Sequence, residues 1–279
     1  MSTDTLAQLE ARAVALTHKS DTQGVRIKLK VFWKTTKFWT AEDIADYQKN
    51  VPGIAERLRT EQYWDKSGDI HSSTFTCEDF AIRVLCEYAA SKGLPVKLTT
   101  GVRTYRNMEL YSPAEHDRYA SNVYGFAEMV MLTYGAPDMQ RKGQNTVQIG
   151  EADQLLPGDL LVQANDIEGR VLAAKKGIKN NVGHHIQMVV STEKERIEIN
   201  QGNSTGMIHF ILPKIMRVLG ENPADPQSSA YAGLPIERGI YTKKNNGSWK
   251  YENLATKRLY PNKLGEFNFY RWGFYEFNR

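Results

Sequence analysis

A cysteine and a histidine of this chain occupy positions in predicted secondary structure that suit thiol chemistry. Cys77 follows Thr76 at the predicted start of a helix, and His185 stands at the start of a predicted strand far downstream. Cysteine-based acyl chemistry needs a thiolate nucleophile, an imidazole base and a polar side chain that orients the imidazole. The sequence therefore holds the two reactive groups of a thiol hydrolase.

The position of Cys77 within its helix favours a reactive thiol. If Thr76 caps the helix, Cys77 is its first residue, where free amides and partial positive charge stabilise a thiolate. One of those amides can also hold the oxyanion of a reacting carbonyl. A second interpretation stays open, because Cys77 shares a helical stripe with Phe80 and Val84 and could pack in the core. Cys86, in mid-helix, fits core packing better.

The strand around residues 184–191 contains two adjacent histidines, and their neighbours distinguish them. Alternate residues of a strand share a face. His185 shares a face with Gln187, whereas His184 shares one with the apolar Ile186 and Met188. We therefore expect His185 to face a polar cleft and to act as the base.

The next predicted strand supplies the candidates for the orienting residue. Glu198 and Asn200 share one face of that strand, opposite Ile197 and Ile199. Either polar side chain could accept the second imidazole N–H and fix the tautomer of the ring. Gln201 comes next and is expected chiefly as a turn residue, with a smaller chance of being the third member of the triad.

Composition sets limits on the class of protein. The chain has 279 residues, of which 41% are hydrophobic and 24% charged, and its net charge is +4. These values are ordinary for a globular protein. No run of Lys and Arg resembles a nucleic-acid arm, and no apolar stretch reaches the ~18 residues of a membrane helix. We expect neither a nucleic-acid partner nor membrane insertion.

The N-terminal residues and the cysteines bear on localisation. Residues 1–20 lack the basic-then-apolar order of a secretory signal. We therefore expect synthesis in the cytoplasm without a cleavable signal, followed by action there or by export along a leaderless route. The two cysteines lie nine residues apart in one predicted helix, which excludes a disulfide between them.

The order of the predicted elements favours an α+β fold, because helices come first and most strands follow. A capped helix from Thr40 is expected to be interrupted at Pro52-Gly53. Residues 220–235 form a predicted loop or linker, and residues 236–279 are rich in aromatic side chains. Helices are predicted at 4–19, from Thr40 to the interruption, in a second short stretch through Leu58, at 77–92 and at 113–134. Strands are predicted at 25–33, 96–100, 159–163, 184–191 and 195–200.

Three segments are predicted from these elements. Residues 1–60 form an N-terminal helical and strand extension, and residues 61–215 form the catalytic core. Residues 216–279 form a loop with an aromatic-rich extension, which could belong to the same domain as the core.

Four short segments of the chain resemble motifs of the NlpC-type cell-wall cysteine peptidases and the CHAP amidases. Both families have a helix-borne cysteine, a strand opened by Pro-Gly-Asp-Leu, and a strand that begins with Gly-His and alternates afterwards. The CHAP pattern continues with Glu-x-Asn on the next strand. The matching segments are Cys77, Pro157-Gly158-Asp159-Leu160, 183–189 and Glu198-Ile199-Asn200.

The resemblance implies a papain-like fold, with N-terminal helices packed on a small antiparallel sheet or half-barrel. It implies Cys77 as nucleophile, His185 as base and Glu198 or Asn200 as the orienting residue, with no metal or organic cofactor. The implied substrate is an amide bond of peptidoglycan peptides. An exported antibacterial effector of this kind would have an immunity or inhibitor protein as its partner.

Two other functions stay open. The same triad could deamidate, acylate or cleave an isopeptide bond on a cytoplasmic protein. Alternatively, the chain could be a non-catalytic binding module in which Cys77 is buried and unreactive. His71, His116 and His209 lack a supporting constellation, and the spacing of the adjacent histidines does not suit zinc. Asp159, next to a turn, is expected to accept local amide hydrogens.

Overall fold

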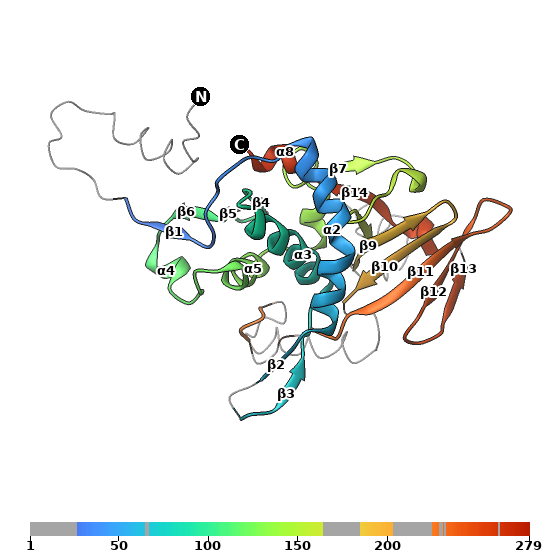
Figure 1. The fold of residues 1–279 in the computed structure, drawn as a ribbon, viewed down its shortest axis with the longest axis horizontal. Coiled ribbons are helices and arrows are strands. Elements are labelled where there is room, and N and C mark those ends of the chain that lie inside the picture. Colours follow the sequence, from blue (N-terminus) through green and yellow to red (C-terminus); the bar gives the residue numbers. More distant parts are fainter. Residues whose placement is uncertain are drawn as a thin grey trace, which may run out of the picture.

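The computed structural model describes residues 27–64, 67–163, 185–202, 225–228, 231, 233–261 and 263–279. The predicted helix at 4–19 and the residue His184 lie outside the described residues. Within them the chain is a mixed α+β structure, in which helices pack against an antiparallel sheet (Figure 1). The predicted α+β class is confirmed at this level.

Five α-helices are present in the described part of the chain. Helix α3 packs against α2, α5 and the sheet strand His185–Glu193 (Figure 1), so it occupies the centre of the helical layer. The helices are α2 (Ala41–Thr60), α3 (Cys77–Lys92), α4 (Pro113–His116), α5 (Val123–Met131) and α8 (Phe274–Phe277).

The main sheet has eight antiparallel strands in the order β13-β12-β11-β10-β9-β8-β14-β7. Strands β8, β9 and β10 fall where the sequence predicts strands, and β14 inserts beside β8 although it lies near the end of the chain. The strands are β7 (Thr146–Ile149), β8 (Leu160–Gln163), β9 (His185–Glu193), β10 (Arg196–Gln201), β11 (Glu237–Lys243), β12 (Trp249–Asn253), β13 (Leu259–Pro261) and β14 (Asn268–Trp272).

Three two-stranded ribbons and three short 3-10 helices complete the described structure. Within the predicted strand at 25–33, the described residues 27–33 form a strand at Leu29–Val31, and the predicted strand at 96–100 contains one strand of a small ribbon. The ribbons pair β1 (Leu29–Val31) with β6 (Met108–Leu110), β2 (Gln62–Trp64) with β3 (Ile70–Ser72), and β4 (Lys97–Thr99) with β5 (Thr104–Arg106). The 3-10 helices are η1 (Ala136–Gln140), η2 (Ala152–Gln154) and η3 (Lys263–Glu266).

Local chemistry sets both ends of α3. The Thr76 side chain accepts a hydrogen bond from the backbone N–H of Asp79, which is the N-cap interaction expected from the sequence. At the other end Gly93 adopts a left-handed conformation with φ 64°, which a glycine reaches without steric cost. The predicted helix over 77–92 is therefore confirmed at both ends.

Two predicted helix boundaries are wrong. Helix α2 continues through Pro52, and burial of Val51, Ala55 and Leu58 against the core offsets the ~3 kcal/mol cost of an internal proline. The single helix predicted over 113–134 is instead two helices. Asn122 is extended and its side chain caps α5 by accepting from the Gly125 N–H, which starts a new helix there.

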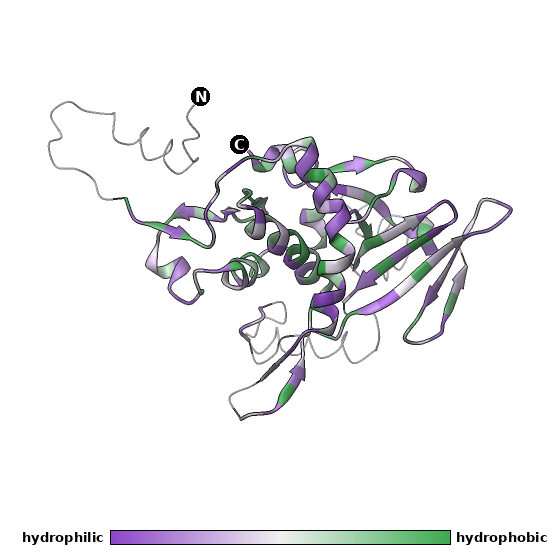
Figure 2. Cartoon of the chain, in the orientation of Figure 1, coloured by the Kyte–Doolittle hydropathy of each residue, from purple (hydrophilic) through white to green (hydrophobic). Residues whose placement is uncertain are grey.

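The sheet separates two hydrophobic clusters. One face, with Ile186 and Met188 of β9, packs against the helices, and Figure 2 shows the apolar residues of α3 and α5 gathered on that side. The other face carries Val189 of β9, Ile197 of β10 and Tyr241 of β11, and it packs against residues around η3. The alternation predicted along β9 is confirmed by this division.

Strands from two predicted segments share the main sheet. Strand β10 lies before the predicted boundary at residues 215/216, whereas β11 pairs with it from beyond that boundary. Strand β14 likewise pairs with β8. The division at 1–60, 61–215 and 216–279 stays a prediction. None of the helices among the described residues has the length and apolar character needed to cross a bilayer.

Candidate active site

Cys77 is the first residue of α3, and its side chain is buried, with a relative exposure of 6%. Helix geometry leaves the first backbone N–H groups without intrahelical acceptors. The Thr76 N–H donates to the Tyr231 hydroxyl at 3.0 Å, and the Asp79 N–H donates to the Thr76 side chain at 3.3 Å. Among the described residues the Cys77 N–H has no hydrogen-bond acceptor, so it is a candidate donor to an oxyanion.

The thiol of Cys77 donates a hydrogen bond to the neighbouring carboxylate. Its Sγ atom lies 3.0 Å from Oε2 of Glu78. Burial, followed by repulsion from the Glu78 charge, raises the pKa of the Cys77 thiol well above its usual value. The backbone N–H groups of Ile186 and Glu78 act in the opposite direction. The resting state is therefore a protonated thiol, whereas the sequence suggested a thiolate already stabilised by the helix.

His185 is half-buried at the start of β9 and is held by a glutamine. Its Nε2 atom lies 2.9 Å from Oε1 of Gln201, the last residue of β10. Because an amide oxygen only accepts, Nε2 must carry the proton and the lone pair of the neutral ring stands on Nδ1. Burial lowers the pKa of His185, although Gln201 and the charge of Glu78 oppose that effect.

A buried network fixes the orientation of the Gln201 amide. Its Oε1 atom also accepts from Nε2 of Gln187 at 2.7 Å, and its own Nε2 donates to the Tyr251 hydroxyl at 2.9 Å. The Tyr241 hydroxyl in turn donates to Oε1 of Gln187 at 2.7 Å. In both Gln187 and Gln201 the amide oxygen accepts a hydrogen bond and the amide nitrogen donates one. The oxygen that accepts from His185 is therefore held in a fixed orientation.

Two contacts join the cysteine helix to the histidine strand. The backbone N–H of Ile186, the residue after His185, interacts with the sulfur of Cys77. Gly202, the residue after Gln201, lies so close to the Phe75–Thr76 backbone that a Cβ atom would stand 2.6 Å from the Phe75 carbonyl oxygen. The structure therefore brings the ends of β9 and β10 to the start of α3.

The two orienting residues favoured by the sequence lie elsewhere. Glu198 is ion-paired with Arg196 at 2.7 Å and with Arg238 at 3.3 Å. Asn200 is buried with its Oδ1 atom lacking a partner within the described part of the chain, and it is paired across the sheet with Met188 of the helix-facing side. The residue hydrogen-bonded to His185 is Gln201, which the sequence offered only as a lesser candidate after Glu198 and Asn200.

A tyrosine from the predicted linker segment braces the start of α3. The Tyr231 hydroxyl donates to Oδ2 of Asp79 at 2.8 Å while it accepts from Thr76. The segment is held further by a two-hydrogen-bond bridge between Leu234 and Phe75. Burial raises the pKa of Asp79 to about 6. The sequence gave no signal for this contact, because it joins residues about 150 positions apart.

Asp159 has a structural role. It accepts from the Leu156 N–H at 2.8 Å, as expected for a turn residue, and from two guanidinium nitrogens of Arg271 at 2.8 and 2.7 Å. The Arg271 side chain comes from β14, so this ion pair ties the Pro-Gly-Asp turn to the strand beside β8.

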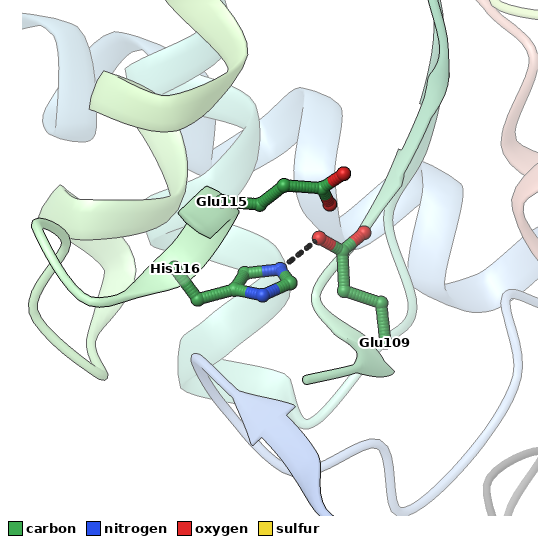
Figure 3. Close-up of side chains that lie close together, drawn as sticks. All are labelled: Glu109, Glu115 and His116. Atoms are coloured by element: carbon green, nitrogen blue, oxygen red, sulfur yellow. Dashed lines mark hydrogen bonds and ion pairs between the residues drawn. The ribbon is translucent and has the colours of Figure 1, made fainter. Parts of the chain in front are cut away.

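Another polar cluster lies away from Cys77 and surrounds His116 (Figure 3). The ligand atoms of Glu109, Glu115 and His116 lie within 4.8 Å of one another, which a metal ion could use. However, Arg103 already forms ion pairs with both carboxylates. The Ser112 N–H donates to Nδ1 of His116, and Nε2 lies 2.6 Å from Glu109. The Arg103 guanidinium therefore already supplies the positive charge that these two carboxylates need. His116 is not the isolated histidine that the sequence suggested.

Comparison of the chain with protein-family models, with curated proteins and with solved structures gives no match in any of the three. What the candidate site does is therefore inferred from its own residues.

Proposed function

We propose that this chain is a cysteine-dependent amidohydrolase in which Cys77 is the nucleophile, His185 the base and Gln201 the residue that orients the base. The observation that carries the proposal is that the backbone N–H of Ile186, next to His185, contacts the sulfur of a helix-start cysteine, while the Nε2 atom of His185 is held by a buried amide. A cysteine, an imidazole and an orienting amide are sufficient for acyl transfer.

The protonation states favour a general-base mechanism. Both the thiol and the imidazole are neutral at rest, so Nδ1 of His185 accepts the thiol proton as the sulfur attacks the carbonyl carbon. A C–S bond forms, and the oxyanion is held by the Cys77 N–H. The imidazolium then gives its proton to the leaving amine as the C–N bond breaks. Water hydrolyses the thioester, with His185 again acting as base.

The proposed substrate is an amide bond in peptidoglycan peptides. This follows the resemblance of the Cys77, 157–160 and 183–189 motifs to cell-wall peptidases. An exported effector with a cognate immunity protein, and a papain-like arrangement of the core, belong to the same proposal.

The first test is digestion of purified sacculi by the intact chain, with the released fragments identified by mass spectrometry. We expect loss of cleavage in Cys77→Ala and in His185→Ala. Retention of cleavage in Cys86→Ala, which removes the other buried thiol, is the matched control. Cleavage that survives Cys77→Ala in a folded protein would refute the assignment of the nucleophile.

The burial and raised pKa of Cys77 favour one rival function, a binding module without catalysis. The rate of Cys77 alkylation by iodoacetamide separates the two. A hydrolase requires a rate that falls in His185→Ala but not in His184→Ala. A binding module requires a Cys77 that stays inert in the wild type and in both variants.

A further inference from the structure

The carboxylate of Glu78 works against the chemistry proposed for its neighbour. It accepts the hydrogen bond of the Cys77 thiol at 3.0 Å, and its charge opposes formation of the thiolate. The Cys77 thiol must break its hydrogen bond to Glu78 before its proton can pass to His185. The catalytic site therefore needs something that engages the carboxylate when substrate binds.

The described part of the protein offers no cation for that purpose. No Lys or Arg side chain within it forms an ion pair with Glu78, and Lys263, whose charge acts on His185, is paired with Glu266 at 2.5 Å. Glu78 lies in the first turn of α3, where the helix dipole stabilises its negative charge. The carboxylate is half-buried, which strengthens its attraction for a cation compared with a fully solvated group.

We propose that Glu78 is a specificity-determining residue that binds a primary ammonium group of the substrate next to the scissile amide, and so releases the Cys77 thiol to His185. The inference rests on the proposed hydrolase function and names its substrate class, an amide that carries an amine close to the reacting carbonyl. A neutral or anionic group at that position leaves Glu78 bonded to the thiol.

The chemistry of this release involves no redox step. The ammonium group donates hydrogen bonds to the Glu78 carboxylate in place of the thiol. The thiol keeps its proton until Nδ1 of His185 accepts it during attack. Substrates that lack the amine therefore meet a less nucleophilic sulfur. The amine is thus expected to raise the rate of the chemical step as well as the affinity for the substrate.

The test uses three methanethiosulfonate reagents that share one reactive group and differ in charge: aminoethyl, methyl and sulfonatoethyl. Labelling of Cys77 in the intact chain is followed by mass spectrometry, and each rate is divided by the rate for free cysteine. We expect the wild type to prefer the aminoethyl over the methyl reagent by about tenfold or more, with the sulfonatoethyl reagent slowest.

Two variants make the test specific. Glu78→Gln is expected to bring the three corrected rates to within about twofold of one another. Glu195→Gln removes the same unit of charge from the exposed turn between β9 and β10, and it is expected to keep the wild-type preference.

Each outcome bears on a different claim. A reactive Cys77 with no charge preference in the wild type, or with a preference that survives Glu78→Gln, overturns the ammonium subsite alone. A wild-type Cys77 that resists all three reagents overturns the hydrolase proposal as well.

Discussion

The side-chain oxygen of Gln201 lies 2.9 Å from Nε2 of His185. His185 is the first residue of β9 and Gln201 the last of β10, so both lie at the same end of two adjacent antiparallel strands. This hydrogen bond leaves Nδ1 as the basic nitrogen of the ring. Gln201 is itself held by Gln187 and Tyr251, so the imidazole is oriented by a side chain that cannot readily rotate.

Removing the Gln201 amide is expected to slow catalysis without preventing folding. A hydrogen bond to a group that becomes charged contributes about 1.5–3 kcal/mol, so Gln201→Ala should lower kcat by about tenfold to a hundredfold. Release of fragments from sacculi measures the effect. Glu198→Gln, which alters an ion pair away from His185, is the control and should leave kcat unchanged. Equal losses in both variants would contradict the role of Gln201.

Replacing Glu78 is expected to lower the pKa of the Cys77 thiol. Burial raises that pKa first, and the Glu78 charge raises it further. Glu78→Gln removes the second cause, so the midpoint of the alkylation rate against pH should move to lower pH. Glu195→Gln should leave the midpoint in place. An unchanged midpoint in Glu78→Gln would show that the carboxylate does not contact the thiol in solution.

Asp79 is expected to make the folded state less stable as pH rises. Burial raises its pKa to about 6, against 3.8 for the unfolded chain, and attraction by Arg83 only partly opposes this. The stabilisation present below pH ~4 is therefore lost as pH rises through about 6, and amounts to about 3 kcal/mol.

Urea unfolding of the wild type and Asp79→Asn between pH 4 and 8 measures that loss. The wild type should lose stability relative to the variant across the window from about 4 to 6. His185, whose lowered pKa acts in the opposite direction, is present in both proteins and cancels in the difference. A difference that stays constant with pH would place the titration of Asp79 outside this range.

The Asp159–Arg271 pair is expected to stabilise the sheet. Asp159 is buried and accepts two hydrogen bonds from the guanidinium, so Arg271→Ala leaves a buried carboxylate without its cation. The free energy of unfolding should fall by about 3–5 kcal/mol. Arg279→Ala breaks the exposed pair with Glu276 and should cost less than about 1 kcal/mol. Urea unfolding of both variants tests the contrast.

Local signals were sufficient for the cysteine helix. Thr76 at the N-cap, Gly93 at the other end and apolar residues at helical spacing between them predict α3 at both of its ends. The interactions behind these signals connect residues only a few positions apart. Pro52 shows the limit of such local signals, because core packing of α2 outweighs the proline and only the tertiary structure contains that packing.

The amino-acid sequence by itself determined which residues of each strand share a face. His185 groups with Gln187, and Glu198 with Asn200, because side chains alternate along a strand. The register between strands decided which of those faces meet, and it pairs Asn200 with Met188, so Gln201 follows on the side of Gln187. Register depends on burial of both faces of the sheet, a long-range effect that alternation within one strand does not specify.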